Sequence, residues 1–92
     1  MRGGGRRDRV DVILAILETI YTERSEAKPT HIMYKANLSH KLMDGYFNEL
    51  IEKGIIEKID VKGKTRISLT EKGSEFLREL RKMKSFMESF GL

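Results

Sequence analysis

The sequence contains no cysteine and only one proline, and it has no long apolar run. Without cysteine the chain has no disulfide, no thiolate zinc site and no cysteine nucleophile. A membrane-spanning helix needs about 18 consecutive apolar residues, and none are present. The charged start MRGGGRRDRV is not followed by a small-residue cleavage signal, so no signal peptide is expected. We therefore expect a cytoplasmic protein with no membrane partner.

Charge is abundant: 35% of the 92 residues are charged, and the net charge is +4. The positive excess lies in residues 1–9 and in residues 35–66, where basic side chains outnumber acidic ones. Basic segments of this kind favour a partner with phosphates, and solvated surface charge is the alternative. The apolar residues are periodic, so the length predicts one folded domain with a modest core.

The first predicted helix spans residues 9–22, where apolar residues recur at steps of three and four. Asp8 is its expected N-cap, and Asp11 is a favourable acid in its first turn. The polar loop ERSEAKP follows it.

The stretch THIMYKANLS begins like a helix and stops after one or two turns. We expect a short helix over 31–36 with Thr30 as its N-cap, ended by Asn37 in a left-handed conformation. Ser39 then caps a third helix over 40–53. The expected buried positions of that helix are Leu42, Tyr46 or Phe47, Leu50 and Ile51.

Two short strands are predicted at 55–59 and 65–69, joined by a tight turn at Gly63. Thr70 is the expected N-cap of a last helix. Its apolar residues are spaced by four, three, four and three, which predicts a seam against a partner helix. The seam residues are Phe76, Leu80, Met83, Met87 and Phe90.

Three helices, a tight turn between the second and third, and a two-stranded hairpin form the winged-helix version of the helix-turn-helix. The expected fold is α+β, mostly α, with a long C-terminal coiled-coil helix. We divide the chain into a basic arm at 1–8, a winged-helix domain at 9–70 and a dimerisation helix at 71–92.

The run THIMYKANLSHKLMDGYFNELIEKGIIE, with the later LTEKGSEFL, resembles the small archaeal winged-helix proteins of the 10a type, a Sulfolobus-type chromatin-associated family. The resemblance covers about residues 9–90. It implies a homodimer joined by an antiparallel coiled coil of the last helix, with two lobes that bind double-stranded DNA. It also implies a nucleoid-associated location.

Candidate DNA contacts follow from where cations and donors fall in this motif. The third helix begins with Ser39, His40 and Lys41 at a positive helix end, which favours phosphate. The other candidates are Lys35 before the turn, Lys62, Lys64 and Arg66 on the hairpin, and Arg6 and Arg7 in the arm. The third helix has no arginine and no paired Asn or Gln, the common base readers, so we expect low sequence specificity.

Other functions have less support. A winged helix can be a protein-docking module without DNA binding, and the acids on the third helix favour that alternative. No nucleophile with a base, paired carboxylates or phosphate loop indicates an enzyme, and no cofactor or small-molecule ligand is expected. The two histidines, nine positions apart, do not make a metal site.

Overall fold

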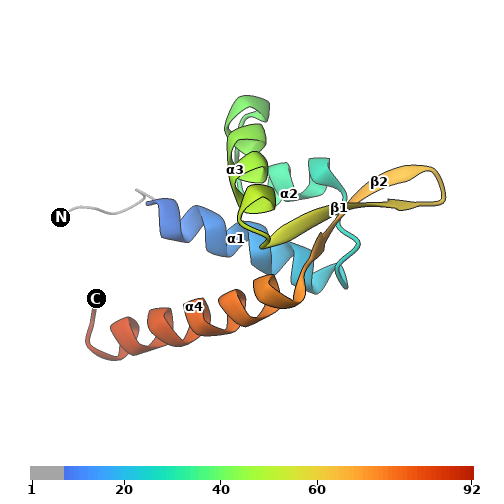
Figure 1. The fold of residues 1–92 in the computed structure, drawn as a ribbon. Helices are drawn as coiled ribbons and strands as arrows, with labels where there is room; N and C mark the ends of the chain where they lie inside the picture. The colour runs from blue at the N-terminus through green and yellow to red at the C-terminus, as the bar shows by residue number, and fades with distance from the viewer. Residues whose placement is uncertain (1–7) are drawn as a thin grey trace.

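The computed structural model describes residues 8–92 (Figure 1). The elements follow the order α1 (Arg9–Thr22), α2 (Pro29–Lys35), α3 (His40–Glu52), β1 (Ile56–Val61), β2 (Lys64–Leu69) and α4 (Glu71–Ser89). This is the predicted, mostly helical winged helix with a long last helix. None of the helices in residues 8–92 is long and apolar enough to cross a membrane.

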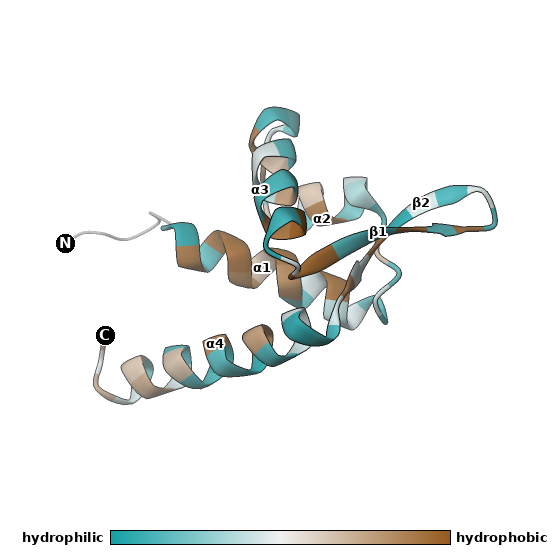
Figure 2. Ribbon diagram, in the orientation of Figure 1, coloured by the Kyte–Doolittle hydropathy of each residue, from teal (hydrophilic) through white to brown (hydrophobic). Residues whose placement is uncertain are grey.

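Helix α1 begins and ends where the sequence predicts. Asp8 and Asp11 form a reciprocal capping box, in which the Asp8 side chain accepts from the Asp11 backbone N–H at 3.0 Å. The helix is apolar along most of its length (Figure 2). Its buried side chains Leu14, Leu17 and Ile20 place it at the centre of the core.

The predicted start of the second helix is wrong. The helix begins at Pro29 after Lys28, and Thr30 makes no cap. Proline suits the first helical position because its fixed φ is helical and its missing N–H would have no partner there. The helix ends at Lys35, one residue before the predicted end, and the predicted left-handed conformation of Asn37 is confirmed: Asn37 has φ 56°, and the Leu38 N–H donates to the Met33 carbonyl at 3.0 Å.

Helix α3 is capped as predicted, since the Ser39 hydroxyl accepts from the Leu42 N–H at 3.2 Å. Its core-facing side agrees with the prediction at Phe47 and Leu50, and partly at Ile51, and differs from it at Leu42. Met43, Phe47 and Leu50 are buried, whereas Leu42 is exposed. Both 42-46-50 and 43-47-50 are helical spacings, so the pattern alone does not decide between them.

Strands β1 and β2 pair antiparallel, with Ile56 opposite Leu69 and Val61 opposite Lys64. Lys62 and Gly63, the two turn residues, both have positive φ, as a type I′ hairpin turn requires. One backbone pairing was not predicted from the sequence, an isolated bridge between the loop after α1 and β2. Ala27 exchanges two backbone hydrogen bonds with Ile67, at 2.8 and 3.0 Å, and so ties the loop after α1 to the hairpin.

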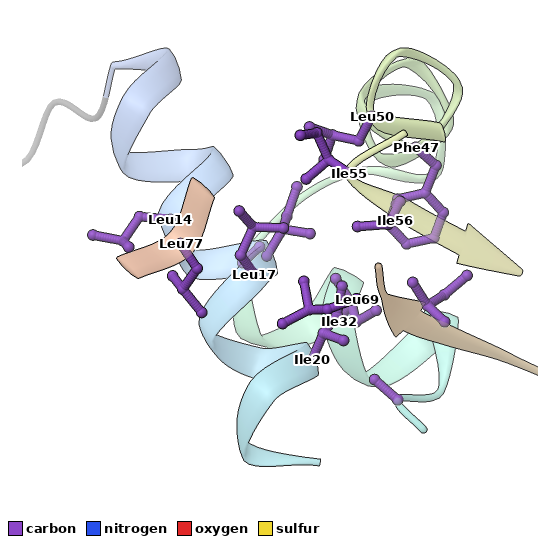
Figure 3. Close-up of a cluster of buried hydrophobic side chains, with 14 of the residues drawn as sticks. Leu14, Leu17, Ile20, Ile32, Phe47, Leu50, Ile55, Ile56, Leu69 and Leu77 are labelled. Atoms are coloured by element: carbon purple, nitrogen blue, oxygen red, sulfur yellow. The ribbon is translucent and has the colours of Figure 1, made fainter. Parts of the chain in front are cut away.

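Helix α4 begins at the predicted cap Thr70 and packs its first half on α1. Leu77 and Leu80 are buried there, in the same core as the side chains labelled in Figure 3. Leu80, predicted as a seam residue, is therefore covered by its own lobe. Phe90 is the C-cap, just past the last helical residue. The assignment of 71–92 to dimerisation stays a prediction.

Candidate nucleic-acid interface

The first turn of α3 is an exposed helix start with donor side chains. Ser39, His40 and Lys41 all lie on the surface. The Ser39 hydroxyl is engaged in capping, and its own hydroxyl hydrogen remains available to a ligand. Figure 1 shows α3 standing away from α4, with the hairpin projecting in a second direction. Both elements therefore present surfaces that α4 does not cover.

One acid of α3 is neutralised by α1. The Arg9 guanidinium donates to the Glu49 carboxylate and lies 5.9 Å from the centre of the Tyr46 ring. The hydrogen bond to Glu49 raises the pKa of Arg9 above its ordinary value. Arg9, which the sequence places next to the basic arm, thus has a partner inside the folded domain. The carboxylate of Glu49 consequently repels phosphates less than a free one would.

The hairpin places cations on one side near its tip. The register sets Lys64 opposite Val61 and Arg66 opposite Ile59, so Lys64 and Arg66 share a face, and Ile67 points to the other face. This confirms the predicted alternation. The Asp60 carboxylate accepts from the Gly63 N–H at 2.8 Å, which fixes the turn that presents Lys62. Arg66 donates to the adjacent Thr65 carbonyl at 3.0 Å.

Cations differ in their partners between the two sides of the molecule. On the second half of α4, Arg81, Lys82 and Lys84 pair with Glu18, Glu79 and Asp11, whereas Arg78 in the first half has no acidic partner among residues 8–92. Within residues 8–92, the lysines near the first turn of α3 and on the hairpin have no acidic partner. These lysines are Lys35, Lys41, Lys58, Lys62 and Lys64. An unpaired cation can bind a phosphate without first losing a carboxylate partner. Arg6 and Arg7 lie outside the described residues.

A second surface is apolar and lies at the end of α4. Met83 and Met87 are 45% and 43% exposed, and Phe86 and Phe90 are more so. The two phenyl rings lie 5.1 Å apart. A groove of about 330 Å³ runs between this end of α4 and the start of α1, lined on one side by Val10 and on the other by Met83 and Met87.

An ion pair lies in that groove. Lys84 Nζ donates to Asp11 Oδ1 at 2.6 Å. The hydrogen bond lowers the pKa of the Asp11 carboxyl and raises the pKa of the Lys84 ammonium. The described residues 8–92 contain no cluster of three His, Asp or Glu side chains that could hold a metal.

Sequence reasoning missed three surface features. Leu42 is 56% exposed on α3, although its apolar character suggested the core. Gly45 lies one turn further on, and an added Cβ there would meet nothing within 4 Å. Phe86 is exposed on α4 outside the predicted seam. A glycine in the interior of an amphipathic helix is a signal that the sequence did offer, since it weakens the helix unless something requires it.

Known structures share this fold. Sso10a-2, a DNA-binding protein from Sulfolobus solfataricus, superposes with a TM-score of 0.78 at 17% identity, over 91% of this chain and 85% of that one. SSV1 F-93 superposes with a TM-score of 0.68 at 19% identity, over 97% of this chain and 99% of SSV1 F-93. The PcaV transcriptional regulator from Streptomyces coelicolor superposes with a TM-score of 0.77 at 17% identity, over 87% of this chain and 58% of PcaV. The predicted resemblance to the 10a type is thus confirmed at the level of the fold.

A search of curated protein sequences found no match. The model of one sequence family, described as winged helix-turn-helix, matches residues 6–88, which is nearly the whole chain. The match includes α1 to β2 and almost all of α4. This chain belongs to the winged helix-turn-helix family.

Proposed function

We propose that this protein binds double-stranded DNA with low sequence specificity. Helix α3 enters the major groove by its first turn, and the hairpin lies along the phosphates. The proposed contacts are Lys35, Ser39, His40, Lys41, Lys62, Lys64 and Arg66, together with Arg6 and Arg7 of the arm. The observation that carries the proposal is the group of lysines near α3 and on the hairpin without acidic partners in the described part of the chain, against the three paired cations on the second half of α4.

The low specificity follows from which side chains α3 exposes. Arginine, the commonest reader of guanine, is absent from the helix. Contacts from lysine, serine and a helix N-terminus position a protein on phosphates without reading bases. Such a protein suits a nucleoid-associated role in the cytoplasm, either architectural or regulatory.

We further propose a homodimer joined by antiparallel α4 helices. Met83, Met87 and Phe90 form an exposed apolar strip that the lobe does not cover. Exposed apolar patches of this kind usually mark an interface. A two-fold dimer would present two α3 helices to one duplex, and simultaneous engagement strengthens binding without new contacts.

The test is a binding titration with a mixed-sequence duplex at about 50 mM salt, repeated at rising salt, since phosphate contacts make affinity fall steeply with salt. Binding that weakens steeply supports the proposal. The absence of binding at about 50 mM salt would contradict the proposal and favour the alternative of a protein-docking module. Selection from a random DNA pool then measures specificity, and a sharp consensus would contradict the low-specificity part.

A further inference from the structure

Leu42 is a large apolar side chain on the outer surface of α3, and the fold does not need it there. Met43, Phe47 and Leu50 supply the contacts of α3 with the core. The side chain of Leu42 is instead 56% exposed, directly after Lys41. It lies in the turn that the proposed function places deepest in the major groove.

Gly45 lies one turn after Leu42 on the same side of the helix. An alanine Cβ at this position would meet nothing within 4 Å, so the fold itself does not require a glycine. Glycine weakens a helix relative to alanine, because it loses more conformational freedom on folding. Without a side chain at this exposed position, another molecule can approach the helix backbone next to Leu42 more closely.

The charge around this position selects the kind of partner. Lys41 and Lys35 are exposed and have no acidic partner in residues 8–92. An exposed leucine that directly follows an unpaired lysine at a helix N-terminus fits a polyanion with an apolar feature. In the major groove of a duplex that feature is the C5-methyl group of thymine, the apolar group displayed by a base pair.

We propose that Leu42 packs against a thymine methyl group in the major groove, with Gly45 leaving room for the base edge. This inference rests on the proposed DNA binding by α3. It predicts a modest preference for thymine-containing sites, and the preference stays compatible with low overall specificity. Burying one methyl group corresponds to about fourfold in affinity.

The experiment compares two duplexes that differ only in this methyl group. One has alternating adenine and thymine, and the other carries deoxyuridine in place of thymine. All hydrogen-bonding groups of the bases are the same in both. The wild-type protein is expected to bind the thymine duplex about fourfold more tightly for each methyl contacted. A guanine–cytosine duplex with and without 5-methylcytosine gives the reciprocal comparison, in which the added methyl group should improve binding.

The variant Leu42→Ala is expected to bind both duplexes equally while keeping its affinity for the deoxyuridine duplex. The matched control is Leu92→Ala, which removes the same atoms from an exposed leucine at the chain end. Any effect of that control through α4 would alter both affinities together and leave their ratio unchanged.

Three outcomes would contradict the inference, and they are distinguishable from one another. Equal wild-type affinity for the two duplexes, with steep salt dependence intact, removes the methyl contact and leaves the proposed function standing. A failure to bind any duplex contradicts both the methyl contact and the proposed DNA binding. A Leu42→Ala variant that keeps the wild-type ratio would assign the methyl preference to another residue and contradict the role of Leu42.

Discussion

Arg9 and Glu49, forty positions apart in the sequence, form an ion pair that joins the start of α1 to the second half of α3. The pair positions one helix against the other and also neutralises an acid on the proposed DNA-binding helix. A carboxylate near the phosphates of a duplex opposes binding, and the effect grows at low salt. In the proposed function, Arg9 would therefore support DNA binding by neutralising Glu49, without contacting the DNA itself.

Replacing Arg9 with methionine is expected to weaken duplex binding several-fold at low salt, because Glu49 is left without its cation. Adding Glu49→Gln to that variant should restore most of the affinity, since the repelling charge is then gone. Titrations of the two variants and the wild type on one duplex measure both effects. A double variant that binds no better than Arg9→Met would mean that Arg9 contacts the DNA directly.

The lysines of the hairpin should determine part of the salt dependence. Each lysine that neutralises a phosphate contributes about 0.9 to the slope of log affinity against log salt. The variant Lys62→Gln with Lys64→Gln is expected to lose about that amount for each lysine that contacts DNA. The control Lys82→Gln lies on α4, where the lysine pairs with Glu79, and its slope should equal that of the wild type.

The proposed dimer would be held by the apolar strip at the end of α4. The variant Met83→Glu with Met87→Glu places two charges in the proposed seam and is expected to sediment as a monomer. Both methionines are about half exposed in the single chain, so the lobe should stay folded. Ser85→Glu, on another side of the same helix turns, should keep the mass of the wild type. A wild-type monomer at micromolar concentration contradicts the dimer.

Local signals in the sequence predicted the helix and strand order well. The caps Asp8, Ser39 and Thr70 all accept the expected backbone hydrogen bonds, and Asn37 ends α2 in the left-handed conformation. Each of these features depends on one side chain and the backbone within three residues of it. Such short-range chemistry is visible in a single sequence.

Features that depend on distant contacts were not predictable in the same way. Nothing near Ala27 in the sequence indicates that Ile67 will pair with it. The choice between Leu42 and Met43 as the buried residue depends on how α3 is rotated against β1 and the core. The candidate DNA contacts could be named from their positions in the winged-helix motif. The ion pair between Arg9 and Glu49 could be found only in the structure, because the two residues are far apart in the sequence.

The Lys84–Asp11 pair should contribute a pH-dependent part of the stability. The pKa of Asp11 is lowered in the fold, so its contribution is present above the ordinary value of about 4 and is lost as pH falls through the lowered value. The pKa of Lys84 is raised, so its contribution is lost only as pH rises above about 10.

The variant Lys84→Met tests this pair. It is expected to return the pKa of Asp11 toward its ordinary value, as measured by an NMR titration of the Asp11 carboxyl carbon. The loss of stability at neutral pH should stay under about 1 kcal/mol, because both side chains are partly exposed. Lys82→Met, whose lysine pairs with Glu79, should leave the Asp11 titration unchanged.

Two glycines in helices should respond in opposite ways to alanine. At Gly73, in the first turn of α4, an added Cβ would lie 1.9 Å from the Ile55 carbonyl oxygen, a backbone atom that cannot easily move. The Thr70 hydroxyl accepts from the Gly73 N–H at 2.9 Å and lies within donating distance of the Gly54 and Ile55 carbonyl oxygens, at 2.5 and 3.1 Å, which explains the LTEKG entry to the helix. Gly73→Ala should therefore destabilise the protein by about 1–3 kcal/mol.

At Gly45, an added Cβ meets open space, so Gly45→Ala should stabilise the protein by up to about 1 kcal/mol. Urea unfolding of both variants measures the two signs, and a duplex titration of Gly45→Ala should show weaker binding despite the greater stability. Tighter or unchanged binding would mean that the backbone at Gly45 is not approached by the DNA.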